Sequence, residues 1–503
     1  NADDYGMFGY LCHYPAGTHK PGEMRKIYDW DSGEYHGEIP EASVTYNVIG
    51  NINEFQLSIA ETTYGGREEM VDPTGIIDYG SLIYLALQRS KTAREAISVM
   101  TSLVEKYGYC SEGETFSICD PNEAWIMEMQ GTGKGSKGVV WVAVRIPDDC
   151  ISGHANHSRI HQFPLKDKDN CLYSKDVISF AREKGYFSGK DKDFSFADAY
   201  APADFGALRF CEARVWSFFN RWAADDMSAY LSYAEGDTKA APMPLYVKPK
   251  QPLSLQDVKD MMRDHYEGTP LALDSDLGQG PWEMPYRPTP LSFEVDGKKY
   301  FNERPISTQQ TANVYVSQMR SWLPDHIGGV IWFGNDDTNM VPLTPVYCSS
   351  LYVPECYAAG TADCFTFSTR SAYWVQNWVS NMVYPRYSAL FPEVKSTRDR
   401  LEKDYTSLQA ETEEKAKSMT HDEAVKFLSE YGSRTAQSML YEWNQLAQTL
   451  IVKYNDMSVK RTNEQGQYEK TPGGNQRPVL RPGYPDAYRH QIIKQTGDRF
   501  LNK

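Results

Sequence analysis

Long apolar runs, closely paired cysteines and clusters of basic residues are all scarce in this sequence. The longest apolar run, residues 138–144, is the length of a strand and falls far short of the ~18 residues that a membrane helix needs. The net charge of -15, with no basic cluster, argues against nucleic acid and anionic membranes as partners. The nine cysteines lack C-x-x-C spacing, which argues against a zinc ribbon or a dense disulfide scaffold. We expect mostly buried thiols, with room for one bridge among Cys348, Cys356 and Cys364.

Several common catalytic motifs are also missing. There is no G-x-S-x-G elbow, P-loop or G-x-G-x-x-G, so serine α/β hydrolases and nucleotide enzymes lose their usual support. His154, His157 and His161 could ligate zinc, but their spacing fits no helical zinc motif and no H-E-x-x-H accompanies them. A metal-dependent amidase is therefore kept only as a minor alternative. Cys12 and His13 are neighbours on an expected strand and should point to opposite faces, so we interpret Cys12 as structural.

The composition is that of a globular protein, with 41% apolar and 24% charged residues over 503 positions. Its first third alternates strands with tight turns. Hairpins are predicted over residues 43–60 and 115–129, and a strand over residues 139–146. A helix should begin after Thr92 and end at Gly108. Strands, then helices, then strands predict a layered α+β domain.

The second half changes in character. Asp296-Gly297 between two alternating runs predicts a type I′ hairpin, and residues 371–384, apolar on all sides, predict a buried helix. Residues 395–454 are charged and helix-prone, whereas 461–503 are rich in Gly, Pro, Asn and Gln and predict an irregular tail. We therefore divide the chain into a main domain with insertions (1–390), a helical extension (391–460) and a C-terminal tail (461–503).

Six strings of residues, found in order along the chain, carry a family resemblance. They lie at 46–54, 60–67, 71–80, 146–156, 209–216 and 332–338. They resemble those of bacterial cysteine dipeptidases of the N-terminal-nucleophile (Ntn) hydrolases, which are related to secernins and more distantly to choloylglycine hydrolases and penicillin V acylases. The resemblance runs from Asn1 to about Leu401. It implies a four-layer αββα sandwich with a helical C-terminal extension, and hydrolysis through a thioester acyl-enzyme without metal or organic cofactor.

The resemblance also implies where the catalytic groups lie. The nucleophile should be an N-terminal cysteine upstream of Asn1, whose own α-amino group acts as the general base. Asp3 is the candidate that holds this amine, and Asp4 is the fallback. Asn156 aligns with a side-chain amide that stabilises the tetrahedral intermediate.

Two further positions follow from the same comparison of strings. Thr63 is a candidate for the second oxyanion position, where relatives have a donating Asn and this chain has a hydroxyl side chain instead. Arg209 or Arg214 matches an arginine near the nucleophile, which could favour the thiolate or bind a substrate carboxylate.

The expected partner is a dipeptide or small peptide with a free amino end. The competing class is a catalytically inactive Ntn-fold protein that binds peptides or serves as a scaffold. The resemblance further implies a homo-oligomer, and we favour a periplasmic or secreted location over a cytoplasmic one.

Overall fold

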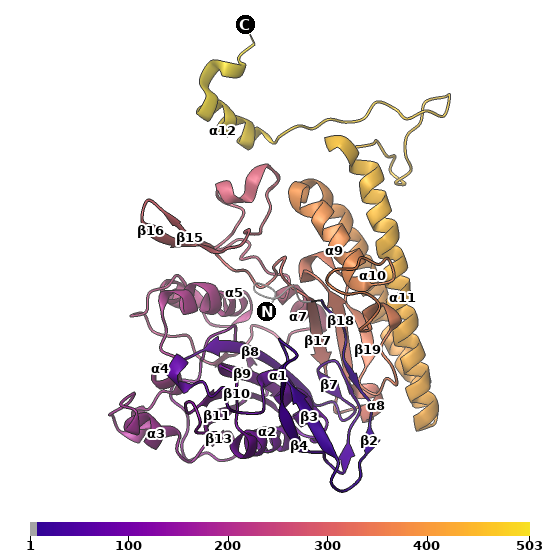
Figure 1. The fold of residues 1–503 in the computed structure, drawn as a ribbon. Helices are drawn as coiled ribbons and strands as arrows, with labels where there is room; N and C mark the ends of the chain where they lie inside the picture. Colours follow the sequence, from indigo (N-terminus) through magenta and orange to yellow (C-terminus); the bar gives the residue numbers. More distant parts are fainter. Residues whose placement is uncertain (1–7, 503) are drawn as a thin grey trace.

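The computed structural model describes residues 8–502, so Asp3 and Asp4 lie outside the described residues (Figure 1). An eight-stranded antiparallel sheet has the order β1-β6-β7-β8-β9-β10-β11-β13. Its strands are β1 (His13–Tyr14), β6 (Val48–Ile49), β7 (Ile52–Asn53), β8 (Ser58–Gly65), β9 (Gly113–Cys119), β10 (Ala124–Gly131), β11 (Val139–Ile146) and β13 (Cys171–Tyr173). A smaller sheet, with the order β17-β18-β19, is made of β17 (Asn313–Gln318), β18 (Val330–Asn335) and β19 (Thr344–Tyr347).

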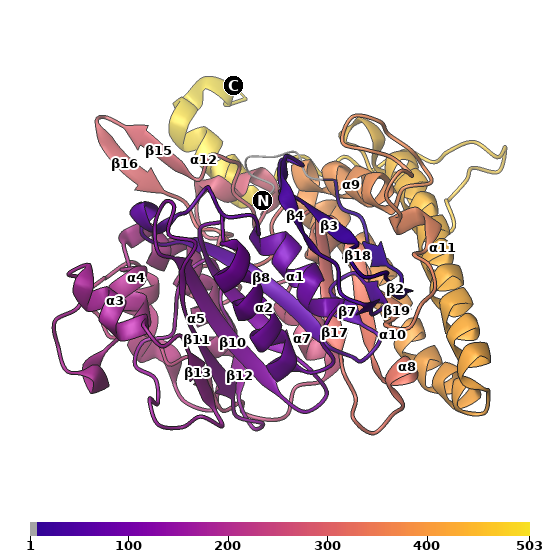
Figure 2. The same ribbon diagram turned by 60° about the horizontal axis from the view of Figure 1, so that its bottom comes forward.

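Helices α1 (Tyr79–Leu87) and α2 (Ala93–Tyr107) cover one face of the large sheet (Figure 2). The Asp78 side chain caps α1 by accepting a hydrogen bond from the Ser81 amide, and Thr92 caps α2 in the same way. Gly108, with φ +84°, ends α2. The predicted boundaries of α2 are confirmed, and the buried side of both helices forms one apolar core with strands β8 to β11.

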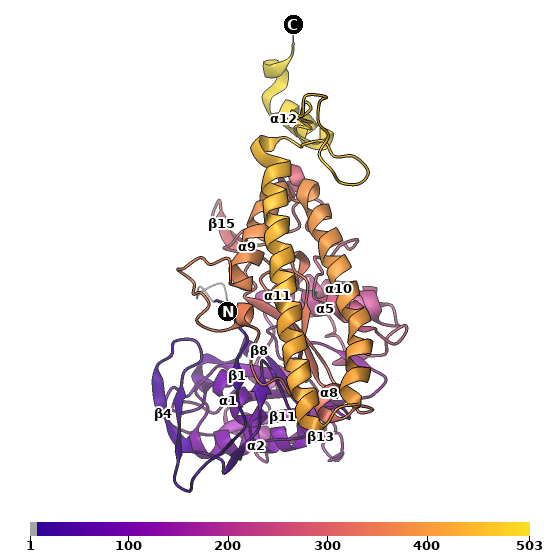
Figure 3. The same ribbon diagram turned by 90° about the vertical axis from the view of Figure 1, so that its right-hand side faces the viewer.

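A second helical layer covers the smaller sheet (Figure 3). It consists of α9 (Ala372–Val383), α10 (Tyr387–Lys417) and α11 (His421–Tyr454). Their buried side chains share a core with Val314 and Ile331 of the smaller sheet and with Ile49 and Ile52 of the large sheet. Ser58 also donates a hydrogen bond across the two sheets to Ser317 (Oγ to Oγ, 2.9 Å). The fold is thus α+β, as predicted, with helices outside two facing sheets.

Smaller helices lie in the segment between the two sheets and between β17 and β18. Helices α3 (Val177–Glu183) and α4 (Phe196–Tyr200) pack against β10 and β11, whereas α5 (Ala213–Trp222) and α6 (Leu231–Ala234) share a separate core. Helix α7 (Leu255–Met261) contacts β17, and α8 (Asp325–Gly328) contacts α10 and α11. Two-stranded ribbons complete the fold: β2 (Gly17–Thr18) with β5 (Val44–Thr45), β3 (Met24–Tyr28) with β4 (Tyr35–Pro40), β12 (Ile151–Ser152) with β14 (Tyr246–Val247), and β15 (Ser292–Val295) with β16 (Lys298–Phe301).

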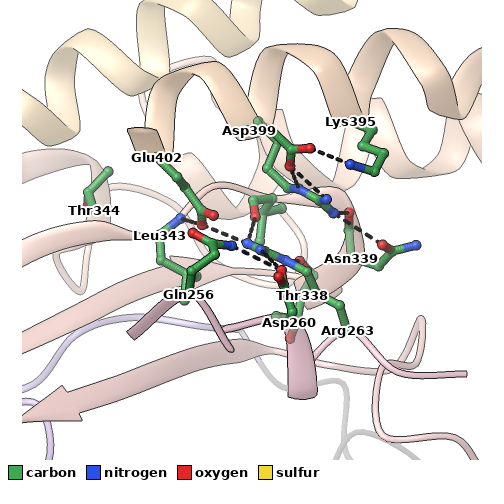
Figure 4. Close-up of polar contacts among 12 residues, drawn as sticks. Gln256, Asp260, Arg263, Thr338, Asn339, Leu343, Thr344, Lys395, Asp399 and Glu402 are labelled. Atoms are coloured by element: carbon green, nitrogen blue, oxygen red, sulfur yellow. Dashed lines mark hydrogen bonds and ion pairs between the residues drawn. The ribbon is translucent and has the colours of Figure 1, made fainter. Parts of the chain in front are cut away.

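Buried charges attach α10 to the loop between β18 and β19 (Figure 4). Glu402 of α10 accepts hydrogen bonds from the Arg263 guanidinium (2.6 Å) and from the Leu343 amide (2.9 Å). Arg398, one turn earlier, donates to the Asn339 carbonyl oxygen. Because the Glu402 and Arg263 side chains are 1% and 5% exposed, each charge depends on its partner. The long helices are therefore part of the packed body.

Three expectations need correction. Instead of one hairpin over residues 43–60 there are two tight turns, because the Asn53 side chain accepts from the Phe55 and Leu57 amides and bends the chain a second time. The tail includes a helix, α12 (Asp486–Thr496). Among the described residues no disulfide joins the cysteines, so the bridge among the last three is absent. No helix between residues 8 and 502 is long and apolar enough for a membrane span.

Candidate active site

Three of the predicted site residues meet beside β8. The Asn156 side chain donates from Nδ2 to the Thr63 carbonyl oxygen (2.8 Å). Its Oδ1 accepts from a guanidinium nitrogen of Arg214 (3.0 Å), which also binds the Ala155 carbonyl oxygen. Residues from β8, from the loop after β12 and from α5 thus form one connected group. Arg214, rather than Arg209, is the arginine in contact with Asn156.

Asn156 has a backbone conformation that non-glycine residues seldom adopt. Its φ is +61°, in the left-handed region, where asparagine is better tolerated than most residues. Such conformations persist only when the surrounding structure holds them, and they gather at functional sites. The loop that carries Asn156 must therefore be firmly anchored.

Arg159 and Glu128 provide that anchor. The Arg159 guanidinium donates to the Gly153 carbonyl oxygen (2.7 Å) and the Pro244 carbonyl oxygen (2.9 Å), and pairs with Glu212 at 2.9 Å. Glu128 of β10 accepts hydrogen bonds from the Ser158 hydroxyl and from the Arg159 amide. Burial raises the pKa of Glu128 to about 7, against the opposing effect of these hydrogen bonds. Both ends of the loop are thereby tied to the sheet and to α5.

Arg209 lies on the π-helical turn Ala207–Glu212 that leads into α5. Its guanidinium pairs with Glu303 at 2.5 Å, away from Asn156. π-Helical turns are rare and often mark functional sites. The two arginines therefore have different partners, and only Arg214 reaches Asn156.

The three histidines considered as zinc ligands have different surroundings. His154 contacts the Thr62 hydroxyl (2.6 Å) and the Ser117 hydroxyl (2.8 Å) on β8 and β9, whereas His161 faces Asp198 at 3.4 Å. Burial, with help from Arg159 and Arg214, lowers the pKa of His154 to about 3. Within residues 8–502 no group of three side chains is arranged to hold a metal ion. His154 therefore acts as a neutral link between strands and loop.

None of the nine cysteines has the properties of an activated thiolate. Burial is the first cause that raises the pKa of every one of them, to about 12 at Cys110 and about 11 at Cys119. Cys110 lies 3.5 Å from a ring nitrogen of His36, but Asp78 and Asp29 nearby also oppose its ionisation. A nucleophilic cysteine needs a lowered pKa or an adjacent base that takes its proton. Cys12 fits the structural role predicted for it.

Two cavities border the end of β8. The larger, about 630 Å³, is lined by Glu61 of β8, by Tyr79 and Tyr84 of α1, and by residues of β17 and β18. The smaller, about 550 Å³, is lined by Asn156 and Tyr64. Both volumes suit a small organic ligand.

Glu61 and Glu114 were missed by sequence reasoning. Glu114 on β9 is fully buried and accepts a hydrogen bond from the Thr63 hydroxyl (3.1 Å). A signal was present in the alternation of Leu57, Ile59 and Glu61, which places a carboxylate on the otherwise apolar face of β8.

Comparison with known proteins agrees with this architecture. The chain matches the family described as Peptidase family C69 over residues 9–400 and belongs to it. It is accordingly a peptide hydrolase. A "Probable dipeptidase" of Latilactobacillus sakei is 25% identical over 349 residues, which cover 68% of this chain and 66% of the relative. A "Probable dipeptidase" of Salmonella dublin is 25% identical over 359 residues, covering 66% and 72%. A "Probable dipeptidase B" of Streptococcus pyogenes serotype M1 is 23% identical over 370 residues, covering 70% and 68%. The matched region is thus about two thirds of the length of these relatives.

Proposed function

We propose that this protein hydrolyses dipeptides through a cysteine nucleophile located upstream of Asn1, by the Ntn mechanism. The observation that carries the proposal is the contact group of Thr63, Asn156 and Arg214, of which Asn156 lines the smaller cavity. The raised pKa values of the nine cysteines support a nucleophile from outside this set. Membership of the C69 family and the dipeptidase names of the relatives support the reaction and the substrate.

The proposed reaction has two steps. The thiol proton passes to the α-amino group of the same cysteine, and the thiolate attacks the peptide carbonyl carbon. The tetrahedral intermediate collapses to a thioester, while the ammonium returns a proton to the departing amine. Water then attacks the thioester carbon, with the amine again taking a proton, and releases the free acid and the thiol.

Asn156 is the proposed oxyanion donor. One hydrogen of its Nδ2 is used by the Thr63 carbonyl oxygen, and the second remains for a developing oxyanion. Arg214 holds Oδ1 and so fixes which end of the amide faces that point. Thr63 would act through its backbone carbonyl oxygen, which holds the Asn156 amide, because its hydroxyl is directed to Glu114. Asp3 remains the proposed orienting group for the α-amine.

The proposal is tested by intact-mass analysis and N-terminal sequencing of the mature protein, with dipeptide turnover measured before and after thiol alkylation. We expect a cysteine at the mature N-terminus, one rapidly alkylated thiol, and loss of turnover on alkylation. Cys12→Ala is the matched control and should retain turnover and remain sensitive to alkylation. A mature protein without an N-terminal cysteine that turns over no dipeptide would refute the proposal in favour of a peptide-binding scaffold.

A further inference from the structure

The Glu61 carboxylate is a charged group in the larger cavity that the proposed reaction does not use. It lies on β8 two residues before Thr63, so both side chains are on the same face of the strand, about 7 Å apart along it. Its direct partner among the described residues is the Glu114 carboxyl group, which makes a hydrogen bond to it. The two oxygens of a carboxylate offer about four acceptor sites, so one such bond leaves most of them available to a ligand. Glu61 therefore has an unused capacity to bind a cation.

Glu114 determines the charge that Glu61 presents. It is fully buried, its Oε2 accepts from the Thr63 hydroxyl, and its Oε1 receives no hydrogen bond from a described residue. The two carboxyl groups lie close enough to interact directly. Burial and the neighbouring Glu61 raise the pKa of Glu114 well above its usual range. Burial raises the pKa of Glu61 as well, but the hydrogen bond from Glu114 acts in the opposite direction, so Glu114 is the member of the pair that holds its proton more firmly.

Aromatic rings form the rest of this wall. Trp30 and Tyr84 are stacked with ring centroids 4.9 Å apart, and both line the same cavity as Glu61. Tyr79 lies beside them and donates its hydroxyl to Asp31 (3.0 Å), a second carboxylate on the lining. Aromatic faces attract ammonium groups through the negative charge of their π-systems. Carboxylate and aromatic groups together make a receptor for an organic ammonium ion, and they leave apolar surface for the carbon chain attached to it.

We propose that Glu61, supported by Glu114, binds the free α-ammonium group of the peptide substrate, while Trp30 and Tyr84 pack against its N-terminal side chain. This inference rests on the proposed function. The substrate class is peptides with an unblocked amino end and an apolar first residue. Thr63, whose carbonyl oxygen accepts from the Asn156 amide, lies two residues from Glu61 on the same strand, so a peptide anchored at Glu61 would extend along β8 toward this contact group. Glu61 would then determine that the peptide bond after the first residue is the one hydrolysed.

The test compares two pairs of compounds on the full-length mature enzyme. Turnover of leucyl-leucine is measured against N-acetyl-leucyl-leucine, and binding of leucinamide against N-acetyl-leucinamide is measured by calorimetry. The variants are Glu61→Gln, which keeps the shape and removes the charge, and Glu114→Gln, which keeps a neutral side chain. Glu105→Gln, on the exposed side of α2, is the matched control.

For the wild-type enzyme we expect kcat/KM for the free peptide to exceed that for the acetylated one by at least about 100-fold. Glu61→Gln should lower kcat/KM for the free peptide by about 10- to 100-fold and leave the acetylated peptide unchanged. Glu114→Gln and Glu105→Gln should retain the preference. Leucinamide should bind the wild type and lose affinity in Glu61→Gln by a similar factor.

The inference would be overturned if Glu61→Gln lowered kcat/KM equally for both peptides, or if the wild-type enzyme hydrolysed the free and acetylated peptides equally well. Either result would leave the peptidase proposal standing. Absence of turnover for every peptide would instead refute the proposed function. In that case, charge-dependent binding of leucinamide at Glu61 would support the ammonium site on its own, and equal binding of both amides would overturn it.

Discussion

Replacing Arg159 with methionine should destabilise the protein and reduce its activity together. Arg159 is 1% exposed at its side chain and its partner Glu212 is 2% exposed. Methionine retains much of the apolar stem but leaves the Glu212 carboxylate buried and unpaired. Removing one partner of a buried ion pair costs about 3–5 kcal/mol. Because the same guanidinium fixes the loop that carries Asn156, turnover should fall as well.

The double variant Arg159→Met/Glu212→Leu separates the two contributions. It removes both charges, and replacing a buried pair by apolar side chains is often neutral or stabilising. The Gly153 and Pro244 carbonyl oxygens still lose their donor, at about 1 kcal/mol each. We therefore expect the double variant to be less stable than wild type by about 2 kcal/mol, and more stable than Arg159→Met.

The assay is denaturant unfolding at pH 7, with dipeptide turnover measured on the same preparations. Arg182→Met is the control, since Arg182 pairs with Asp191 at the surface and its loss should cost under about 1 kcal/mol. An Arg159→Met protein within 1 kcal/mol of wild type, or a double variant less stable than the single one, would show that the pair is not the anchor inferred here.

Three further predictions follow from other parts of the molecule. Burial raises the pKa of Asp336 to about 7, so between about pH 4 and about pH 7 the folded state retains a proton that the unfolded state has lost. The free energy of unfolding should therefore fall as pH rises from about 4 to about 7. Asp336→Asn, which suits φ +70°, should flatten this slope and raise the melting temperature at pH 8, and an unchanged pH profile would contradict the assignment. Asn156→Gly keeps the backbone conformation at φ +61° but removes the side-chain amide. We expect kcat to fall by about 10²- to 10³-fold and the melting temperature to stay unchanged. Full activity of this variant would exclude the oxyanion role. Deleting residues 482–503 should leave the melting temperature unchanged in scanning calorimetry, because no residue of α12 is buried, and a lower value would reveal packing by the tail.

Local chemistry was sufficient to predict many elements. The helix capped by Thr92 and ended by Gly108, the strand over residues 139–146 and the Asp296-Gly297 hairpin all form where the sequence predicts them. In each case the deciding interaction is short in range: a cap, an alternating pattern or a turn with positive φ at both central residues. The first hairpin was predicted wrongly because the hydrogen bonds that two backbone amides donate to the Asn53 side chain, rather than the turn residues alone, decide the path of the chain.

By itself the sequence determined the α+β class, these local elements and, through its ordered strings, the family. It also brought Thr63, Asn156 and the two arginines forward as candidates, while the division of the chain and the role of Asp3 stay predictions. Tertiary structure alone decided that Arg214 rather than Arg209 reaches Asn156, and that Glu61 and Glu114 share one site. The physical reason is that these contacts join residues about 50 or more positions apart, whose energies depend on burial and distance, and neither quantity is expressed in local residue patterns.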